Sequence, residues 1–315
     1  MVLNNVLNQQ INNEEVLEAK HIFAIDYLKV KVEITNNPLE LSQNMVIPLT
    51  KFDGEFQPLQ ESYSKQWVCG SYNDHIQIKA INKNEILIHG NLFKWLNGQN
   101  VTGTTDLIQL VLDTVNRLSQ IFNTITPTDT EIENIKLGLF RIYRIDVNKA
   151  LLFDDKQKAQ QYLSSIKEHG TYPRRDREVE NNGIYFGKGS KRTTLLYYFK
   201  GQEIRSHNKQ QTTLTTELRE YADRMIRCEV RLFNQQLRDQ ELNYGYCWNE
   251  ELVKHLVEDS HSKLNLPEPV SEIELPAKYI RFLATQKQGA LHVGYTASTR
   301  ARYKRDLARD YGLMV

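Results

Sequence analysis

The chain has 315 residues, of which 40% are hydrophobic and 25% charged, so its composition is that of an ordinary globular protein with one large or two moderate domains. No apolar run approaches the roughly 18 to 20 residues that span a bilayer, and the polar, Asn-rich start lacks the pattern of a signal peptide, so we expect a cytoplasmic protein that does not contact membranes. The formal net charge of +1 averages over local basic clusters and does not exclude nucleic acid, which would then be contacted through patches.

The first part of the chain contains a polar arm followed by strands. Residues 1–20 are rich in Asn, Gln and Glu and show little apolar periodicity, so we expect a flexible arm. Apolar residues then alternate with polar ones within 21–35, which predicts a half-buried strand. The segments 75–80 and 85–89 flank a turn-forming Asn-Lys-Asn sequence and predict a hairpin.

The middle of the chain alternates between helical and strand-like patterns. The loop at 97–106 ends in capping residues and predicts a helix over 107–122. The other predicted elements are a central strand at 136–147, a helix at 155–168, a hairpin of 183–186 with 193–199, a helix at 217–225 and a strand at 226–233.

Helical patterns dominate after residue 240, at 250–259, 271–286 and 298–311, and two prolines in Leu266–Pro269 indicate a linker. We expect an α+β fold with a largely antiparallel sheet and helices packed on one face, plus a smaller helical C-terminal region. The predicted division of the chain is a flexible arm at 1–20, a main domain at 21–240 and a helical region at 241–315 that is a candidate for DNA binding.

Two adjacent tyrosines, Tyr197 and Tyr198, lie at the end of the predicted strand 193–199. A tyrosine hydroxyl can attack a DNA phosphate and become covalently joined to it, and Lys200, two positions further on, would share a strand face with Tyr198. Aromatic residues are also common in strands, where such a pair usually supplies one core and one surface residue. Catalysis and packing therefore both remain open for this pair.

Acidic residues follow the same strands. Asp146 ends the central strand, Glu203 follows Lys200 by three positions, and Glu229 lies between Arg227 and Arg231. Alternation places Arg227, Glu229 and Arg231 on one strand face. A carboxylate between two guanidinium groups is expected to stay ionised and to suit a hard metal ion. The alternative is an exposed strand face with ordinary ion pairs, and it applies equally to Arg144 beside Asp146.

Two basic segments are candidates for phosphate contacts. Lys188, Lys191 and Arg192 belong to a Gly-rich turn whose amides and cations would suit a phosphate, although the turn lacks the Walker spacing and does not indicate nucleotide hydrolysis. Arg302 and Arg305 belong to a basic C-terminal helix that would suit DNA phosphates. A solvated turn and a solvated helix are the alternatives. The three cysteines, Cys69, Cys228 and Cys247, lack zinc spacing and are expected to be reduced.

Taken in order, several short segments resemble the phage and plasmid replication initiators of the gene II/X type, the filamentous-phage rolling-circle nickases. The resemblance covers roughly residues 22 to 240. The segments are Ile25–Leu28, Leu96–Leu107, Arg144–Asp146, Ser190–Leu195, Tyr198–Glu203 and Arg227–Arg231.

The resemblance implies an enzyme that nicks one strand of a circular duplex at an origin through a tyrosine. The 5′-phosphotyrosine intermediate leaves a free 3′-hydroxyl for rolling-circle replication, and the same chemistry later rejoins the strand. The Tyr-x-Lys-x-x-Glu pattern implies that Tyr198 is the nucleophile and Lys200 its charge partner, with Tyr197 as a neighbour that could substitute. The implied partners are origin DNA of a phage or plasmid and a host helicase and polymerase in a bacterial cytoplasm, and a homodimer is left open.

The resemblance also implies Mg²⁺ or Mn²⁺, held by Asp146 and Glu229 with Glu203 and Gln99 as further candidates. Gln99 stands where the phage initiators have a histidine, and glutamine lacks the basicity of imidazole. The basic residues near these positions, Arg144, Arg227 and Arg231, would contact DNA. Two rivals remain: a mobilisation relaxase, although the His-x-His cluster typical of relaxases is absent, and a non-catalytic origin-binding protein or replication repressor.

Overall fold

The computed structural model describes residues 23–42, 45–46, 49–52, 55–58, 62–72, 74–207, 214–266, 275–287 and 294–311. The predicted arm at 1–20 and the prolines of the predicted linker lie outside these residues. The chain divides into two compact units, a larger one of 1–167 and 172–264 and a smaller one of 168–171 and 265–315. The functional division at residue 240 stays a prediction.

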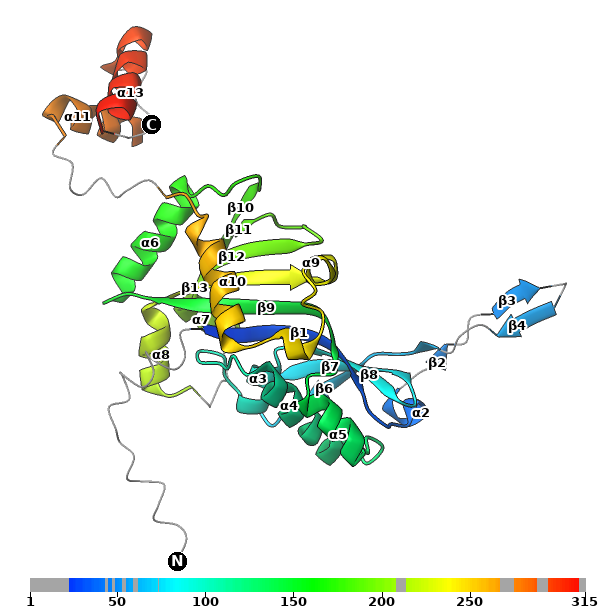
Figure 1. The fold of residues 1–315 in the computed structure, drawn as a ribbon. Coiled ribbons are helices and arrows are strands. Elements are labelled where there is room, and N and C mark those ends of the chain that lie inside the picture. Colours follow the sequence, from blue (N-terminus) through cyan, green and yellow to red (C-terminus); the bar gives the residue numbers. More distant parts are fainter. Residues whose placement is uncertain are drawn as a thin grey trace, which may run out of the picture. The chain divides into compact units, whose positions relative to one another are not determined.

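The larger unit is built on a nine-stranded sheet whose pairings are all antiparallel, in the order β10-β11-β12-β13-β9-β1-β8-β7-β6 (Figure 1). This confirms the predicted α+β class. Two small two-stranded sheets pair β2 (Met45–Val46) with β5 (Ser62–Tyr63) and β3 (Leu49–Phe52) with β4 (Glu55–Pro58). The large sheet contains β1 (Phe23–Glu33), β6 (Gln66–Cys69), β7 (His75–Asn82), β8 (Glu85–Gly90), β9 (Arg141–Leu152), β10 (Arg177–Glu180), β11 (Gly183–Phe186), β12 (Thr193–Phe199) and β13 (Met225–Phe233).

Two short helices, α7 and α8, pack on the face of this sheet that carries Ala150 and Met225, and helices that include α3 and α10 cover the opposite face. On the β1-β8-β7-β6 half, the alternating apolar residues of each strand are buried on this face, and the Trp95 indole N–H donates to the Val68 carbonyl at 3.1 Å. On the other half, α10 packs against β9, β13 and β1, as Figure 1 shows. The helices of the unit are α2 (Pro38–Leu41), α3 (Leu92–Asn97), α4 (Leu107–Ile121), α5 (Asp129–Lys136), α6 (Lys156–His169), α7 (Lys200–His207), α8 (Thr216–Asp223), α9 (Asn234–Asp239) and α10 (Glu250–Ser262), with a 3₁₀ turn η1 (Gly245–Cys247).

Local capping explains where two of these helices begin. Asp106 accepts the Gln109 N–H at 2.9 Å and starts α4, as the capping residues of the loop predict. A capping box between Thr128 and Glu131 starts α5, which extends to Lys136. The predicted strand from residue 136 was therefore wrong at its start, because these residues continue a capped helix and the strand begins only at Arg141.

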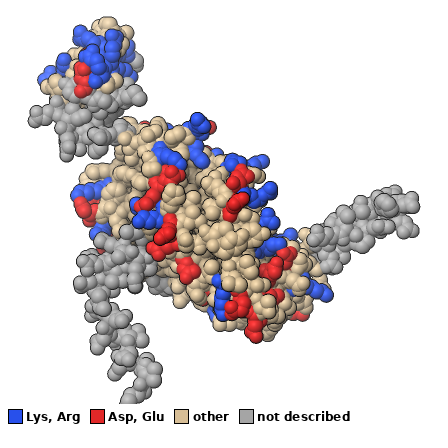
Figure 2. Space-filling view, viewed as in Figure 1, with Lys and Arg blue, Asp and Glu red and all other residues tan. Residues whose placement is uncertain are grey.

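The smaller unit contains α11 (Ala277–Lys287) and α13 (Ala297–Tyr311), which confirm helices in the predicted region. Tyr279, Phe282 and Leu307 form its core, and Tyr303 packs against them. Tyr303 is therefore a packing residue of the basic helix. Figure 2 shows that Lys and Arg dominate the charged side chains on the visible part of this unit, whereas both signs mix on the visible part of the larger unit.

Candidate active site

The sheet face opposite α10 holds a pocket of about 350 Å³ between β12, β13, β9 and β1, and α7 borders it. Its lining includes Tyr198 and the carboxylates of Asp26, Asp146, Glu203 and Glu229. The structure thus brings together, in one place, a tyrosine and four acidic side chains that lie far apart in the sequence. Among the described helices, none is long and apolar enough to cross a membrane.

The tyrosine pair is divided between the two faces of β12. Tyr198 lines the pocket, whereas the Tyr197 hydroxyl lies 2.8 Å from Nδ1 of His261 in α10 and its ring meets Phe186 edge to face. Tyr197 is completely buried. The alternation of a strand therefore separates the two rings, as the sequence indicates, and leaves Tyr198 as the pocket tyrosine.

Sheet register sets the neighbours of Tyr198. It pairs with Arg227 on β13 and with Gly183 on β11, and the next pair on this face joins Leu196 to Glu229. A Cβ at Gly183 would lie 2.4 Å from the Tyr197 carbonyl oxygen and 3.0 Å from the Tyr198 Cβ. Glycine at this position therefore allows β11 to approach the strand that carries Tyr198.

Lys200 reaches Tyr198 by a route different from the predicted one. β12 ends at Phe199 and Lys200 begins α7, so the expectation of a shared strand face was wrong. The ammonium nevertheless lies 5.9 Å from the centroid of the Tyr198 ring. It is fully buried and donates to Glu203 Oε2 at 2.7 Å and to Asn100 Oδ1 at 2.9 Å. Glu203 also belongs to α7 and not to a strand.

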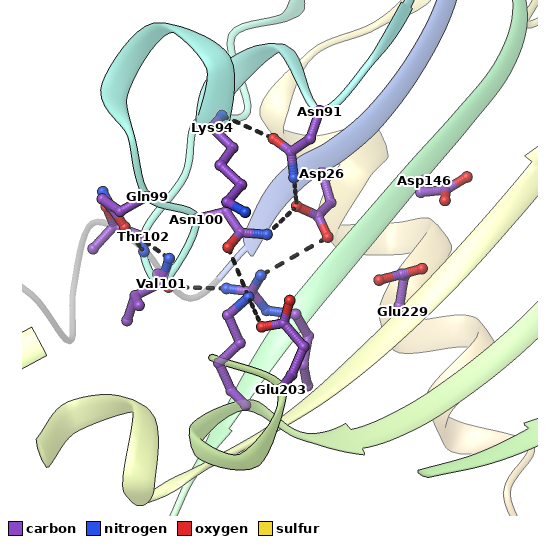
Figure 3. Close-up of polar contacts among 12 residues, drawn as sticks. Asp26, Asn91, Lys94, Gln99, Asn100, Val101, Thr102, Asp146, Glu203 and Glu229 are labelled. Carbon is purple, nitrogen blue, oxygen red and sulfur yellow. Dashed lines mark hydrogen bonds and ion pairs between the residues drawn. The ribbon is translucent and has the colours of Figure 1, made fainter. Parts of the chain in front are cut away.

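Asp26 is a central pocket residue that the sequence patterns did not single out. The β1–β9 register shifts between Ile25 and Tyr27, so a bulge at Asp26 turns its carboxylate into the pocket. It accepts hydrogen bonds from Asn91 and, at 3.0 Å, from Asn100, and it lies 4.0 Å from the Arg227 guanidinium (Figure 3). An acidic residue inside an otherwise apolar strand was the available signal.

Burial and charge set the protonation of this cluster. Burial acts to raise the pKa of Asp26, but the charges of Arg227 and Lys200 and the hydrogen bonds from the two asparagines together hold that pKa below the ordinary value. Burial raises the pKa of Tyr198 well above its ordinary value, although Arg227 opposes the shift. Burial likewise lowers the pKa of Lys200. The free protein therefore holds Asp26 as a carboxylate and Tyr198 as a phenol.

Two further carboxylates, Asp146 and Glu229, lie on the neighbouring strands β9 and β13, to one side of Asp26 in Figure 3. Arg144 donates to both oxygens of Asp146, at 2.8 and 2.6 Å, and Arg231 donates to Glu229 at 2.7 Å. Asp146 and Glu229 are 2% and 3% exposed, so the alternative of an open face with solvated ion pairs was wrong.

The expectation that the guanidinium groups keep Glu229 ionised was also wrong. Burial raises its pKa to about 7, with Arg231 opposing and Asp146 adding to the rise. Burial raises the pKa of Asp146 too, against its partners Arg144 and Arg231. Desolvation of a carboxylate thus outweighs the nearby cations on this strand pair.

The pocket supplies donors for a divalent cation without a complete protein-built site. In the described residues, no three His, Cys, Asp or Glu side chains gather into a metal-binding group. Mg²⁺ often binds through one or two carboxylates together with substrate phosphates and water. The negative charge of Asp146 raises the pKa of the buried Glu229, and a cation bound between the two carboxylates would relieve this repulsion.

The side chain of Gln99 is occupied within its own loop. Its Oε1 accepts the backbone N–H groups of Val101 and Thr102, at 2.7 and 3.1 Å, and its Nε2 donates to the Thr102 hydroxyl. Figure 3 shows Gln99 on the far side of Asn100 from Asp146 and Glu229. The loop in turn supplies the Val101 carbonyl that accepts from Arg227 at 2.9 Å.

The predicted DNA-contacting residues fall in three places. Arg144 and Arg231 line the pocket, and Arg227 is buried beside it. Lys188 pairs with Glu178 and Glu180, Arg192 pairs with Asp239 at 2.5 Å, and Lys191 is exposed in the same turn. Arg302 and Arg305 belong to α13 of the smaller unit. Within the larger unit, β9 and β13 thus bring Arg144 and Arg231 to the pocket.

Comparisons with known proteins relate the chain to replication proteins. It is 26% identical over 203 residues to the replication-associated protein (gene II type) of Enterobacteria phage I2-2, a match that covers 61% of this chain and 58% of that protein, less than two thirds of its length. The rolling circle replication initiator protein from Geobacillus stearothermophilus is similar in structure with 14% identity and a TM-score of 0.33, over 83% of this chain and 95% of that one. The family model that describes the N-terminal part of the phage gene II replication-associated protein matches residues 24–251. The chain therefore belongs to the family of phage gene II replication-associated proteins.

Proposed function

We propose that this protein nicks one strand of a circular duplex at a replication origin through Tyr198, starts rolling-circle replication and later rejoins the strand. The observation that carries the proposal is the pocket, in which a tyrosine lies beside two buried cations and two further buried carboxylates. These are the groups that a phosphoryl transfer to a tyrosine requires. Host helicase and polymerase would then act on the nicked origin, and a homodimer stays open.

The covalent step follows from the position of Tyr198. Its hydroxyl loses a proton, and the oxygen bonds to the phosphorus of the scissile phosphodiester. The bond from phosphorus to the 3′ oxygen breaks, and that oxygen takes up a proton to become the free 3′-hydroxyl. Lys200 and Arg227 favour the negative charge that develops on the phenol oxygen and the phosphate. Attack of the 3′-hydroxyl on the phosphotyrosine reverses the step without ATP.

Asp146 and Glu229 would hold Mg²⁺ or Mn²⁺, and the bound cation would polarise a phosphoryl oxygen. Glu203 already forms an ion pair with Lys200. We therefore assign it the role of positioning the lysine in preference to that of a metal ligand. Asp26 fixes the orientation of Arg227 from one side while the Val101 carbonyl holds it from another. The protein side chains thus fix the two cations that face the reacting phosphate.

The test uses supercoiled circular DNA that carries the protein's own origin, incubated with Mg²⁺. Wild-type protein and Tyr197→Phe are expected to relax the DNA and to form a covalent protein–DNA adduct, whereas Tyr198→Phe forms neither. Absence of nicking and of adduct with the wild-type protein would overturn the proposed function. Nicking by Tyr198→Phe together with inactive Tyr197→Phe would overturn the assignment of the nucleophile.

A further inference from the structure

The sheet face that holds the pocket continues across β1, β8, β7 and β6. From Leu28 in β1 and along the other three strands the burial alternates, with one set of side chains buried and the other half-buried or exposed. The second set consists of Lys29, Lys31, Leu87, His89, Gln77, Lys79, His75, Trp67 and Cys69. This face is the one that the pocket occupies, because Tyr27 and Arg144 belong to the same rows.

Strand register aligns one row of these side chains across five strands. Arg144 pairs with Lys29, Lys29 with His89, His89 with Gln77, and Gln77 with Trp67. Four strand spacings of about 4.8 Å separate the ends of this row by about 19 Å. That length accommodates about five stacked nucleotides at 3.4 Å per base. The row begins at the pocket and ends at the sheet edge.

Cations accompany the row. Lys79 pairs in register with Leu87, one row beside His89, and Lys65 precedes β6. Within the described part of the chain, no ion pair involves Lys29, Lys65 or Lys79, whereas Lys31 pairs with Glu85. Burial and, after it, the charges of Lys65, Lys29 and Arg144 together lower the pKa of His89 to about 4, so all three cations lie near this imidazole. The face therefore presents cations available to an anion.

An exposed aromatic ends the row. Trp67 is 64% exposed, whereas Trp95 and Trp248 are 1% and 6% exposed. A large exposed aromatic beside lysines that form no ion pair with the described residues is the combination that single-stranded nucleic acid binds, through base stacking and backbone charge. A sheet face presents its strands side by side rather than a helix or ribbon that enters a duplex groove, so it suits an unpaired strand better than a duplex.

We propose that the row Arg144, Lys29, His89, Gln77 and Trp67, with Lys79 and Lys65 beside it, binds the single-stranded DNA that adjoins the nicking site. The inference rests on the proposed function for the placement of the scissile phosphate at Tyr198. The lysines contact phosphates and Trp67 stacks on a base about 19 Å from Arg144. The DNA strand would therefore leave the pocket along β1, β8, β7 and β6.

Trp67 provides its own reporter. The full chain is titrated with oligothymidylate of about 20 nucleotides, longer than a site of this size needs, while tryptophan fluorescence and the anisotropy of a labelled oligonucleotide are recorded. Binding is expected to quench the wild-type fluorescence. Trp67→Phe should lose the quenching but retain most of the affinity, because phenylalanine still stacks. Trp67→Ala should lose both, with an affinity lower by about 5- to 150-fold.

The lysines are tested by salt dependence. Lys29→Ala and Lys79→Ala should each weaken binding and reduce the slope of log K against log salt by about 0.7. Tyr246→Ala and Lys136→Ala are matched controls, since Tyr246 is 58% exposed and Lys136 pairs with Glu133 on α5. Both should bind like the wild type. Unchanged affinity and quenching in Trp67→Ala, or equal losses in the controls, would overturn the proposed surface.

The covalent adduct separates this inference from the proposed function. Adduct formation with wild-type protein together with unaltered oligothymidylate binding by the Trp67 and lysine variants would reject the surface and retain the function. Weakened binding by these variants with no adduct from the wild-type protein would reject the function and retain a single-strand surface.

Discussion

The two faces of the nine-stranded sheet differ in what they carry, and Tyr197 and Tyr198 belong to one face each. Tyr197 is buried against Phe186 and bonds to His261 of α10, in a setting of packed side chains. Tyr198 faces carboxylates and cations in a pocket. Because successive side chains of a strand point to opposite faces, two identical neighbouring side chains have different surroundings: Tyr197 packs in the core and Tyr198 faces charged groups.

The sheet face that holds the pocket, called the open face below, has two parts that differ in the burial of their charged side chains. In the pocket half, Asp146, Arg227 and Glu229 are almost completely buried, so each depends on its neighbours. In the β1-β8-β7-β6 half, the lysines are half-buried and keep access to water. Substitutions should consequently disturb stability in the pocket and DNA affinity on the rest of the face.

The largest effect on stability is expected from Arg227→Met. It removes the guanidinium 4.0 Å from Asp26 and leaves a largely buried carboxylate with less compensation. The free energy of unfolding should fall by about 3 to 5 kcal/mol, as for a broken buried pair. Urea denaturation measures the change. The double variant Arg227→Met with Asp26→Asn should recover part of the lost stability. An equal loss in the single and the double variant would contradict an interaction between Arg227 and Asp26.

Glu229→Gln should stabilise the metal-free protein at high pH. The folded pKa of about 7 lies above the ordinary value of 4.5, so ionisation costs stability as pH rises through this window, and the cost is complete above pH 7. The amide removes a cost of up to about 3 kcal/mol at pH 8 and almost none at pH 4. Urea denaturation in EDTA at both pH values tests this, and a pH-independent difference would contradict it.

Tyr197→Phe should destabilise the protein modestly and leave nicking intact. The substitution removes the 2.8 Å hydrogen bond to His261 but keeps the ring in its packed position. The expected loss is about 1 kcal/mol. Thermal unfolding and the adduct assay, performed on the same preparation, distinguish a packing role from a catalytic one. Loss of adduct at full stability would show that the two faces are not functionally distinct.

The smallest effect on stability is expected on the open half of the sheet. Lys29→Ala removes a half-buried cation with no ion pair among the described residues. The free energy of unfolding should change by less than about 0.5 kcal/mol. Denaturation of this variant beside Arg227→Met compares the two parts of the open face directly. A loss comparable to that of Arg227→Met would mean that this half is structural as well.

Periodicity predicted most of the fold because half-buried strands and amphipathic helices each require a regular spacing of apolar residues. β1, the β7–β8 and β11–β12 hairpins and α4 all lie where their patterns indicate. The start of β9 was misplaced because the capping box of α5 acts over a few residues that carry no strong apolar period. The orientation of the tyrosine pair was predictable for the same reason as the strands.

The pocket was only partly predictable. Tyr198, Lys200, Asp146 and Glu229 came from their order along the chain, but Asp26 depends on a bulge that no periodicity reveals. The raised pKa of Glu229 depends on depth of burial, which the alternation of charges cannot supply. Long-range register also determines which strands carry the row from Arg144 to Trp67, and local sequence does not encode it.

The most direct test of the central claim is to locate the covalent bond. The wild-type adduct on origin DNA is treated with nuclease and trypsin, and the peptide Thr193–Lys200, which contains both tyrosines, is sequenced by fragment-ion mass spectrometry. The phosphate is predicted on Tyr198, the pocket tyrosine, with Tyr197 unmodified. A phosphate on Tyr197 or on a residue outside this peptide would contradict the account.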